Sequence, residues 1–352
     1  MIESTSEKNN RQVATWLMLG VLMIIIQVLI GGITRLTESG LSITEWKPIT
    51  GALPPLTDEA WQQEFAKYRG TDQFKYVHQY FSLNDFKYIF FWEWFHRLWA
   101  RLLGVVFLIG FVYFVVRKKI TRRMIAPLVL LFLLGGLQAV IGWLMVKSGL
   151  VPEKYFVGHV ELTTHLVAAL ILLAYTCWFA ISLLPAYQEK IRNTGVKKLL
   201  WFITALFFIQ LIYGGFMAGL KAASVAPTWP DINGKMMPTF SGSIINDPLA
   251  VHFIHRGLAY LLLVVVGWFY FKTKFLATNR QFNVFRNLLM LLIIMQALLG
   301  IFSLLNATSP KAFVFFGVTH QFIAMLLVIC ITVLLYIVGN DDKQYKKALS
   351  VN

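Results

Sequence analysis

The run VATWLMLGVLMIIIQVLIGGI, from Val13 to Ile33, carries no charged residue and is long enough to cross a bilayer as one helix. Seven further apolar runs of sufficient length follow it along the chain: Phe90–Val116, Met124–Val146, Leu162–Leu184, Leu199–Leu220, Pro248–Phe271, Leu288–Leu305 and Phe313–Val338. The sequence therefore predicts an all-α integral membrane protein with eight transmembrane helices.

The overall composition supports this class. Of the 352 residues, 57% are hydrophobic and 14% are charged, and the mean hydropathy is +0.64. A soluble domain carries about 25% charged residues, so the apolar excess here must face membrane lipid. The net charge of +15 does not indicate nucleic acid as a partner, because the basic residues form short clusters between apolar runs. Cys177 and Cys330 lie inside such runs and are not placed for a disulfide or a metal site.

The distribution of Lys and Arg predicts the orientation. The loops after the second, fourth and sixth runs hold thirteen of these residues, and the short loops on the other side hold five. By the positive-inside rule both termini are cytoplasmic and the long segment 34–89 lies outside, in a bacterial inner membrane. That segment mixes Pro, Gly and aromatic residues, which favours a structured cap over a flexible linker.

An internal repeat relates the two halves of the chain. Each odd-numbered run carries Gln-x-x-x-Gly near its outer end, at Gln27/Gly31, Gln138/Gly142, Gln210/Gly214 and Gln296/Gly300. Each even-numbered run begins on the outer side with a histidine, at His96, His165, His255 and His320. The repeat predicts two pseudo-symmetric four-helix bundles, residues 1–190 and residues 191–352, related by an axis along the membrane normal.

Four histidines at matching depth predict haem binding. Ionisable side chains inside a span are costly and usually functional. Two imidazoles that project inward from neighbouring helices can serve as the axial ligands of a haem iron, one haem for each bundle. The alternative is that each histidine only hydrogen-bonds between helices, and four in register with a repeat argue against it.

The halves differ at one position. Glu93-x-x-His96-Arg97 in the first half aligns with His252-x-x-His255-Arg256 in the second. A carboxylate one helical turn before the histidine of one half predicts that this half performs proton chemistry while the other transfers electrons. The alternative is a glutamate that only reaches the membrane interface.

Other polar residues carry weaker predictions. His78 in the outer segment is expected to be a solvated loop histidine, and His159 has no counterpart in the second half. Arginine pairs naturally with carboxylates, so four arginines near the outer ends are candidate partners of haem propionates. These candidates are Arg35, Arg97, Arg101 and Arg256. The glycine pairs Gly31/Gly32, Gly135/Gly136 and Gly214/Gly215 permit close approach of a helix or a porphyrin.

Several motifs together resemble the haem A synthase family, in its alphaproteobacterial and mitochondrial subgroup. They are GGITRLTESGLSITEWKPITGALPP from Gly31 to Pro55, EWFHRLWARLLG from Glu93 to Gly104, GWLMVKSGL from Gly142 to Leu150, TTHL at Thr163 and HRGLAY at His255. The resemblance covers nearly the whole chain. Another branch of that family has a cysteine pair in the first outer loop; residues 34–89 have none, so no thiol step is expected here.

The resemblance implies a membrane-bound, haem-dependent oxidoreductase that converts the C8 methyl group of haem O to a formyl group by successive hydroxylations, giving haem A for cytochrome oxidase. It implies that His255 and His320 ligate the iron of a resident haem b. It further implies that His96 and His165 line the substrate haem site and that Glu93 takes part in catalysis.

The same resemblance implies partners. These are the substrate haem O, haem O synthase and cytochrome oxidase assembly factors. An unidentified electron donor is also expected, and a homo-oligomer is possible. Two other classes compete with the synthase. A two-haem electron-transfer cytochrome would have equivalent halves, and a haem transporter would have polar breaks at the membrane midplane.

Overall fold

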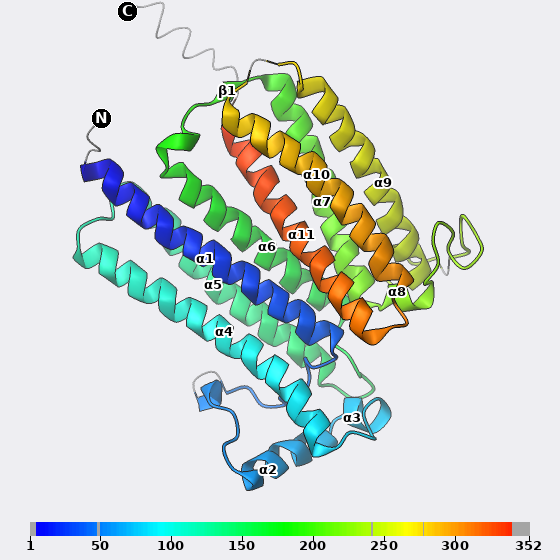
Figure 1. The fold of residues 1–352 in the computed structure, drawn as a ribbon. Coiled ribbons are helices and arrows are strands. Elements are labelled where there is room, and N and C mark those ends of the chain that lie inside the picture. The colour runs from blue at the N-terminus through cyan, green and yellow to red at the C-terminus, as the bar shows by residue number, and fades with distance from the viewer. Residues whose placement is uncertain (1–4, 48–49, 241, 277, 340–352) are drawn as a thin grey trace, which may run out of the picture.

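The computed structural model describes residues 5–47, 50–240, 242–276 and 278–339. Within these ranges eight helices are long and apolar enough to cross a membrane, as the sequence predicted. They are α1 (Thr5–Leu36), α4 (Leu83–Val116), α5 (Arg122–Gly149), α6 (His159–Ser182), α7 (Thr194–Gly219), α9 (Pro248–Thr273), α10 (Arg280–Leu305) and α11 (Pro310–Ile337). The chain is a multi-pass, all-α membrane protein (Figure 1).

Three of these helices, α1, α4 and α10, begin seven or eight residues before the apolar run that predicted them, and polar caps account for two of them. Ser82 accepts a hydrogen bond from the Asp85 backbone while the Asp85 carboxylate accepts one from the Ser82 backbone, so α4 starts at Leu83 rather than Phe90. Asn279 caps α10 through the backbone N–H of Phe282. Hydropathy reports only the part of a helix that lies in lipid, whereas a polar cap sets where the helix begins.

The long connection between α1 and α4 is a folded cap, as predicted. It holds η1 (Thr50–Ala52), α2 (Asp58–Arg69) and α3 (Asp72–Tyr76). Tyr68 packs with Phe86, Ile89 and Phe90 in a small aromatic core of its own. We call the end of the protein that carries this connection the loop end (Figure 1).

Equivalent helices of the two halves pack in a similar way. α1 packs on α4 as α7 packs on α9, and α5 packs on α6 as α10 packs on α11. The halves meet through α1, α6, α7 and α11, with α6 against α11 at the centre. This arrangement is consistent with a pseudo-symmetric pair of four-helix bundles.

Side chains of one half pack directly against the helix backbone of the other half near the loop end. Gln321 of α11 lies so close to Gly32 of α1 that no Cβ would fit there, and its amide donates to the Val28 carbonyl at 2.9 Å. On the other side, a Cβ on Gly215 of α7 would lie 2.5 Å from the Thr163 hydroxyl of α6. These glycines therefore serve helix packing, the simpler of the two roles predicted for them.

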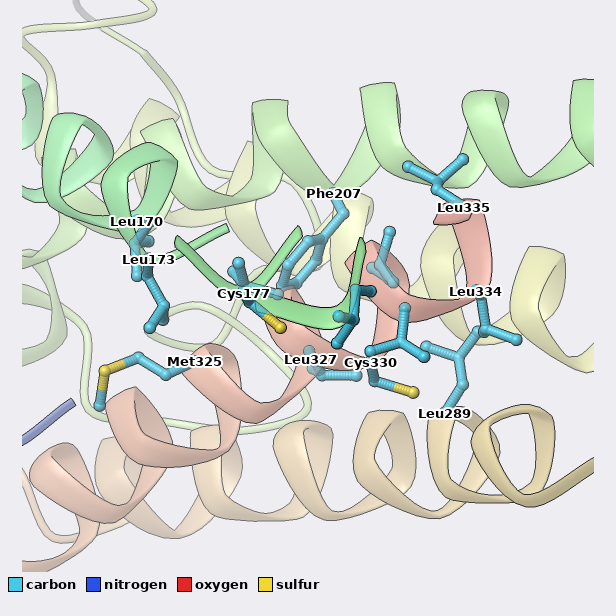
Figure 2. Packing of buried hydrophobic residues seen from close by; sticks show 14 of the residues in the cluster. Leu170, Leu173, Cys177, Phe207, Leu289, Met325, Leu327, Cys330, Leu334 and Leu335 are labelled. Atoms are coloured by element: carbon cyan, nitrogen blue, oxygen red, sulfur yellow. The ribbon is translucent and has the colours of Figure 1, made fainter. Parts of the chain in front are cut away.

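The opposite end, where α1 begins and α11 ends, is the terminal end. The main apolar core runs toward it and includes Leu173, Phe207 and Met325 (Figure 2). Cys177 and Cys330 are buried there as free thiols. A short parallel pairing of β1 (Ile191–Arg192) with β2 (Val338–Gly339) closes this end, and η2 (Pro185–Tyr187) precedes it; the remaining short helix, α8 (Ala222–Val225), follows α7 at the loop end.

Candidate functional site

Each of the four histidines is hydrogen-bonded to a glutamine of the preceding membrane helix. In every case a glutamine amide nitrogen lies 3.1–3.4 Å from a ring nitrogen. The pairs are Gln27 with His96, Gln138 with His165, Gln210 with His255, and Gln296 with His320. The repeat of the sequence is therefore a repeat of helix hairpins, each of which orients one imidazole.

The glycine of each Gln-x-x-x-Gly motif gives the imidazole its space. One turn after the glutamine, a Cβ would lie between 2.8 and 3.3 Å from the Cε1 atom of the ring. The pairs are Gly31 with His96, Gly142 with His165, Gly214 with His255, and Gly300 with His320. We call these four the imidazole-facing glycines. The sequence predicted close approach at Gly31 and Gly214, and the structure shows that the approaching group is the histidine ring.

The histidines of one half lie near each other. His96 and His165 interact electrostatically in the first half, and His255 and His320 do so in the second. Among the described residues, no group of three or more His, Cys, Asp or Glu side chains is placed to hold a metal ion. Two imidazoles are too few ligands for a metal ion held by protein alone. They suit a haem iron, whose remaining ligands come from the porphyrin.

Unsatisfied polar atoms gather at these pairs. The Oε1 atom of all four glutamines is buried without a hydrogen-bond partner in the described chain, and so are the Nδ1 atoms of His255 and His320. Buried polar groups usually have a hydrogen-bond partner. A buried polar atom that lacks one therefore needs a further explanation. A polar or metal-bearing ligand between the paired histidines would explain it, so the donor set fits a haem in each half.

Glu93 is buried at 3% exposure, and its carboxylate is bound by three donors. Arg97 donates at 2.6 Å, the Ser42 hydroxyl at 2.8 Å and the Ile43 backbone at 2.9 Å. Arg97 also donates to the carbonyls of Ile43 and Glu45. Arg97 lies on α4, one residue after His96, whereas Ser42 and Ile43 belong to the outer connection, so the pair fixes the start of that connection beside His96.

His252 occupies the equivalent position in the second half. It is 1% exposed, and the Nε atom of Arg256 donates to its Nε2 at 3.0 Å. Arg256 also donates to carbonyls of the loop between α8 and α9, at Thr228, Pro230 and Asp231. Each half therefore uses an arginine at i+4 to hold its own outer loop, with a carboxylate as its partner in one half and an imidazole in the other.

The other two candidate arginines also lie at the loop end. Arg35 donates to the Ala218 carbonyl at the end of α7, and Arg101 donates to the Lys47 carbonyl at 2.9 Å. All four arginines bind backbone carbonyls here, and Arg97 also pairs with the Glu93 carboxylate. Their role toward propionates remains a prediction.

His78 is not a solvated loop histidine, and that prediction was wrong. It is 4% exposed, its Nδ1 lies 2.7 Å from the Tyr68 hydroxyl, and its Nε2 lies 3.2 Å from the Glu38 carboxylate. Glu38 also pairs with Lys221, which follows α7 in the other half. The hydrogen bond from His78, followed by that from Lys221, lowers the Glu38 pKa to about 2. The aromatic core of the cap buries the histidine, a tertiary effect that loop composition does not report.

His159 also has a structural position. Its ring packs edge-on against Phe216 of α7 at 5.6 Å, and its backbone lies against Gly219. It belongs to the contact between the halves. Sequence reasoning missed the glutamines as partners of the histidines, although both recur with the same period.

Comparison with known proteins places the chain in a family. A family described as "Cytochrome oxidase assembly protein" matches residues 14–332. A "Heme A synthase" of Flavobacterium johnsoniae is 36% identical over 341 residues, covering 94% of this chain and 98% of that protein. A "Heme A synthase" of Maricaulis maris is 39% identical over 334 residues, 92% of this chain and 95% of its own length. One of Parvibaculum lavamentivorans is 42% identical over 282 residues, 78% and 80% respectively.

Proposed function

The chain belongs to the cytochrome oxidase assembly protein family, and from that membership we propose that it is a haem A synthase. It is a membrane-bound oxidoreductase that converts the C8 methyl group of haem O to a formyl group by successive hydroxylations. The observation that carries the proposal is the pair of neighbouring imidazoles in each half, each fixed by a glutamine and given space by a glycine.

The second half is proposed to hold a resident haem b. His255 and His320 would be its axial ligands, supported by their buried, unpartnered Nδ1 atoms and by the space at Gly214 and Gly300. When bound, this group would supply electrons for the oxidation in the other half. The protein residues set its position, since each imidazole is held between a glutamine and a helix backbone.

The first half is proposed to bind the substrate. His96 of α4 and His165 of α6 would bind the iron of haem O, and the porphyrin would then lie near the loop end. Candidate partners for propionates of the two haems are Arg35, Arg97, Arg101 and Arg256, whose side chains all lie at this end.

Glu93 is proposed to take part in proton transfer at the substrate. It lies one turn before His96, it is buried, and the second half has an imidazole in its place. Its three donors hold the carboxylate as a fixed acceptor. Through Arg97 it also holds the outer connection over the site, so a substitution will report on both roles unless folding is measured separately.

Location and partners follow from the same proposal. The loop end faces outward from a bacterial inner membrane, with both termini in the cytoplasm, as the charge of the loops predicts. Haem O synthase would supply the substrate and assembly factors of cytochrome oxidase would receive the product. An unidentified donor would reduce the haem b.

Pigment analysis tests the function. The protein is purified from cells that make haem O, and its haems are extracted and separated. We expect haem A together with haem b and haem O. Replacement of His255 or His320 by Ala should remove the low-spin haem b spectrum. Purified wild-type protein with haem b alone, and no conversion of added haem O, would instead indicate an electron-transfer cytochrome.

A further inference from the structure

The first half is open on one side, and the second half is not. α4 packs on α1, and α5 packs on α6, but the backbones of α4 and α5 approach each other closely at almost no point. The equivalent helices α9 and α10 do pack together. A lateral gap therefore separates α4 from α5 in the first bundle, and no such gap separates α9 from α10 in the second.

Two aromatic contacts bound this gap. Toward the terminal end, the rings of Phe107 on α4 and Phe132 on α5 stack with centroids 6.4 Å apart. At the loop end, Trp46 of the outer connection lies 6.4 Å from Trp143 of α5, with the Arg97 guanidinium 5.9 Å from the Trp46 ring centre. From His96 to Phe107 is about 16 Å along a helix at 1.5 Å per residue, so a gap of that height lies beside the substrate site.

Small residues line the gap between these contacts. Gly104 on α4 and Gly135 and Gly136 on α5 lie between the two aromatic pairs. A Cβ on any of the three would meet nothing within 4 Å. Glycine lowers helix stability, and here it is not needed for contact with another helix. Each of these glycines leaves the space beside its helix unfilled.

The second half has side chains where the first has glycines. Gly104 lies eight residues after His96, and the residue eight after His255 is Leu263, which packs on the main core. Gly135 lies three residues before its motif glutamine, and the equivalent residue of α10 is Ile293, which is 5% exposed. In the half proposed to keep its haem, large side chains therefore occupy the positions where the first half has glycine.

We propose that the gap between α4 and α5 is the lateral passage by which haem O moves from the lipid of the outer half of the bilayer to His96 and His165. The inference rests on the proposed function. A porphyrin dissolved in lipid is large, flat and apolar, so it needs an opening without side chains in the hydrocarbon region. The resident haem of the second half needs no such opening. The buried Gln138 amide oxygen, which has no partner in the described chain, lies on α5 between the two aromatic contacts.

The test fills the gap as the second half fills its own. Gly104→Leu and Gly135→Ile are made separately, with Gly267→Leu on α9 as the matched control, since a Cβ there also meets nothing within 4 Å. Each purified protein is mixed with phosphatidylcholine and phosphatidylglycerol vesicles that contain haem O, and binding is followed by absorbance. The haem b spectrum of each variant reports folding.

Both gap variants should keep haem b and take up haem O about tenfold more slowly, which corresponds to an added barrier of about 1.4 kcal/mol. The control should match wild type. If a gap variant with normal haem b takes up haem O at the wild-type rate, the passage lies elsewhere, such as through the loop end. If the wild-type protein itself binds no haem O, the proposed function fails, and the passage that rests on it is rejected with it.

Discussion

The imidazole-facing glycines should respond to alanine in a graded order set by their distances. An added Cβ would lie 2.8 Å from the His165 ring at Gly142, 2.9 Å from His96 at Gly31, 3.1 Å from His320 at Gly300 and 3.3 Å from His255 at Gly214. Carbon atoms in ordinary contact are about 3.6 Å apart. The ring must therefore move by roughly 0.8 Å at Gly142 and by roughly 0.3 Å at Gly214.

Two opposing effects set the magnitude. Excess volume in a packed site costs about 1–3 kcal/mol, and alanine in place of glycine within a helix gains about 0.5–1 kcal/mol. We therefore expect Gly142→Ala and Gly31→Ala to destabilise by about 1–2 kcal/mol, and Gly214→Ala to change stability little. Gly267→Ala is the control, because its Cβ meets nothing and only the helical gain remains.

Denaturation in detergent measures the free energy of unfolding of each variant, and the haem b absorbance reports the second half. Gly300→Ala should disturb the haem b bands more than Gly214→Ala, because its ring is displaced further. Equal effects at the four positions, or the largest effect at Gly214, would refute the reasoning that the glycines exist to seat the rings.

Three further outcomes follow from the structure. Glu93→Gln should keep haem b but lower the haem A yield per haem b by about 10²-fold, the lower end of the range usual for proton transfer by a positioned side chain. Unchanged yield per haem b with poorer folding would mean a packing role. Glu38→Gln should destabilise the protein at about pH 7. The difference in stability from wild type should shrink as the pH falls from about 4.5 toward about 2, because a carboxyl with a lowered pKa contributes stability only while ionised. A difference that grows in acid would contradict this sign. Cysteine introduced at the exposed Tyr76 should react with an impermeant thiol reagent added outside, whereas cysteine at Arg117 should not, and labelling at Arg117 would reverse the orientation.

Much of the fold could be predicted from single residues and their spacing. Eight runs of apolar residues became eight helices because each must satisfy its backbone within the lipid, and no other element can do so alone. The four histidines and four Gln-x-x-x-Gly motifs were found because a repeat keeps equivalent residues at equal spacing. The asymmetry between Glu93 and His252 was visible for the same reason, and both side chains are buried as the alignment required.

Only the tertiary structure decided which side chains contact one another. Lipid is as apolar as the inside of the bundle, so hydropathy cannot distinguish a helix face that packs from one that faces lipid. The sequence therefore determined that α4 and α9 cross the membrane, and only the structure showed that α9 closes on α10 while α4 stands apart from α5. Likewise, the burial of His78 and the binding of Glu93 by Ser42 and Arg97 depend on how the outer connection folds back over α4, which no local pattern specifies.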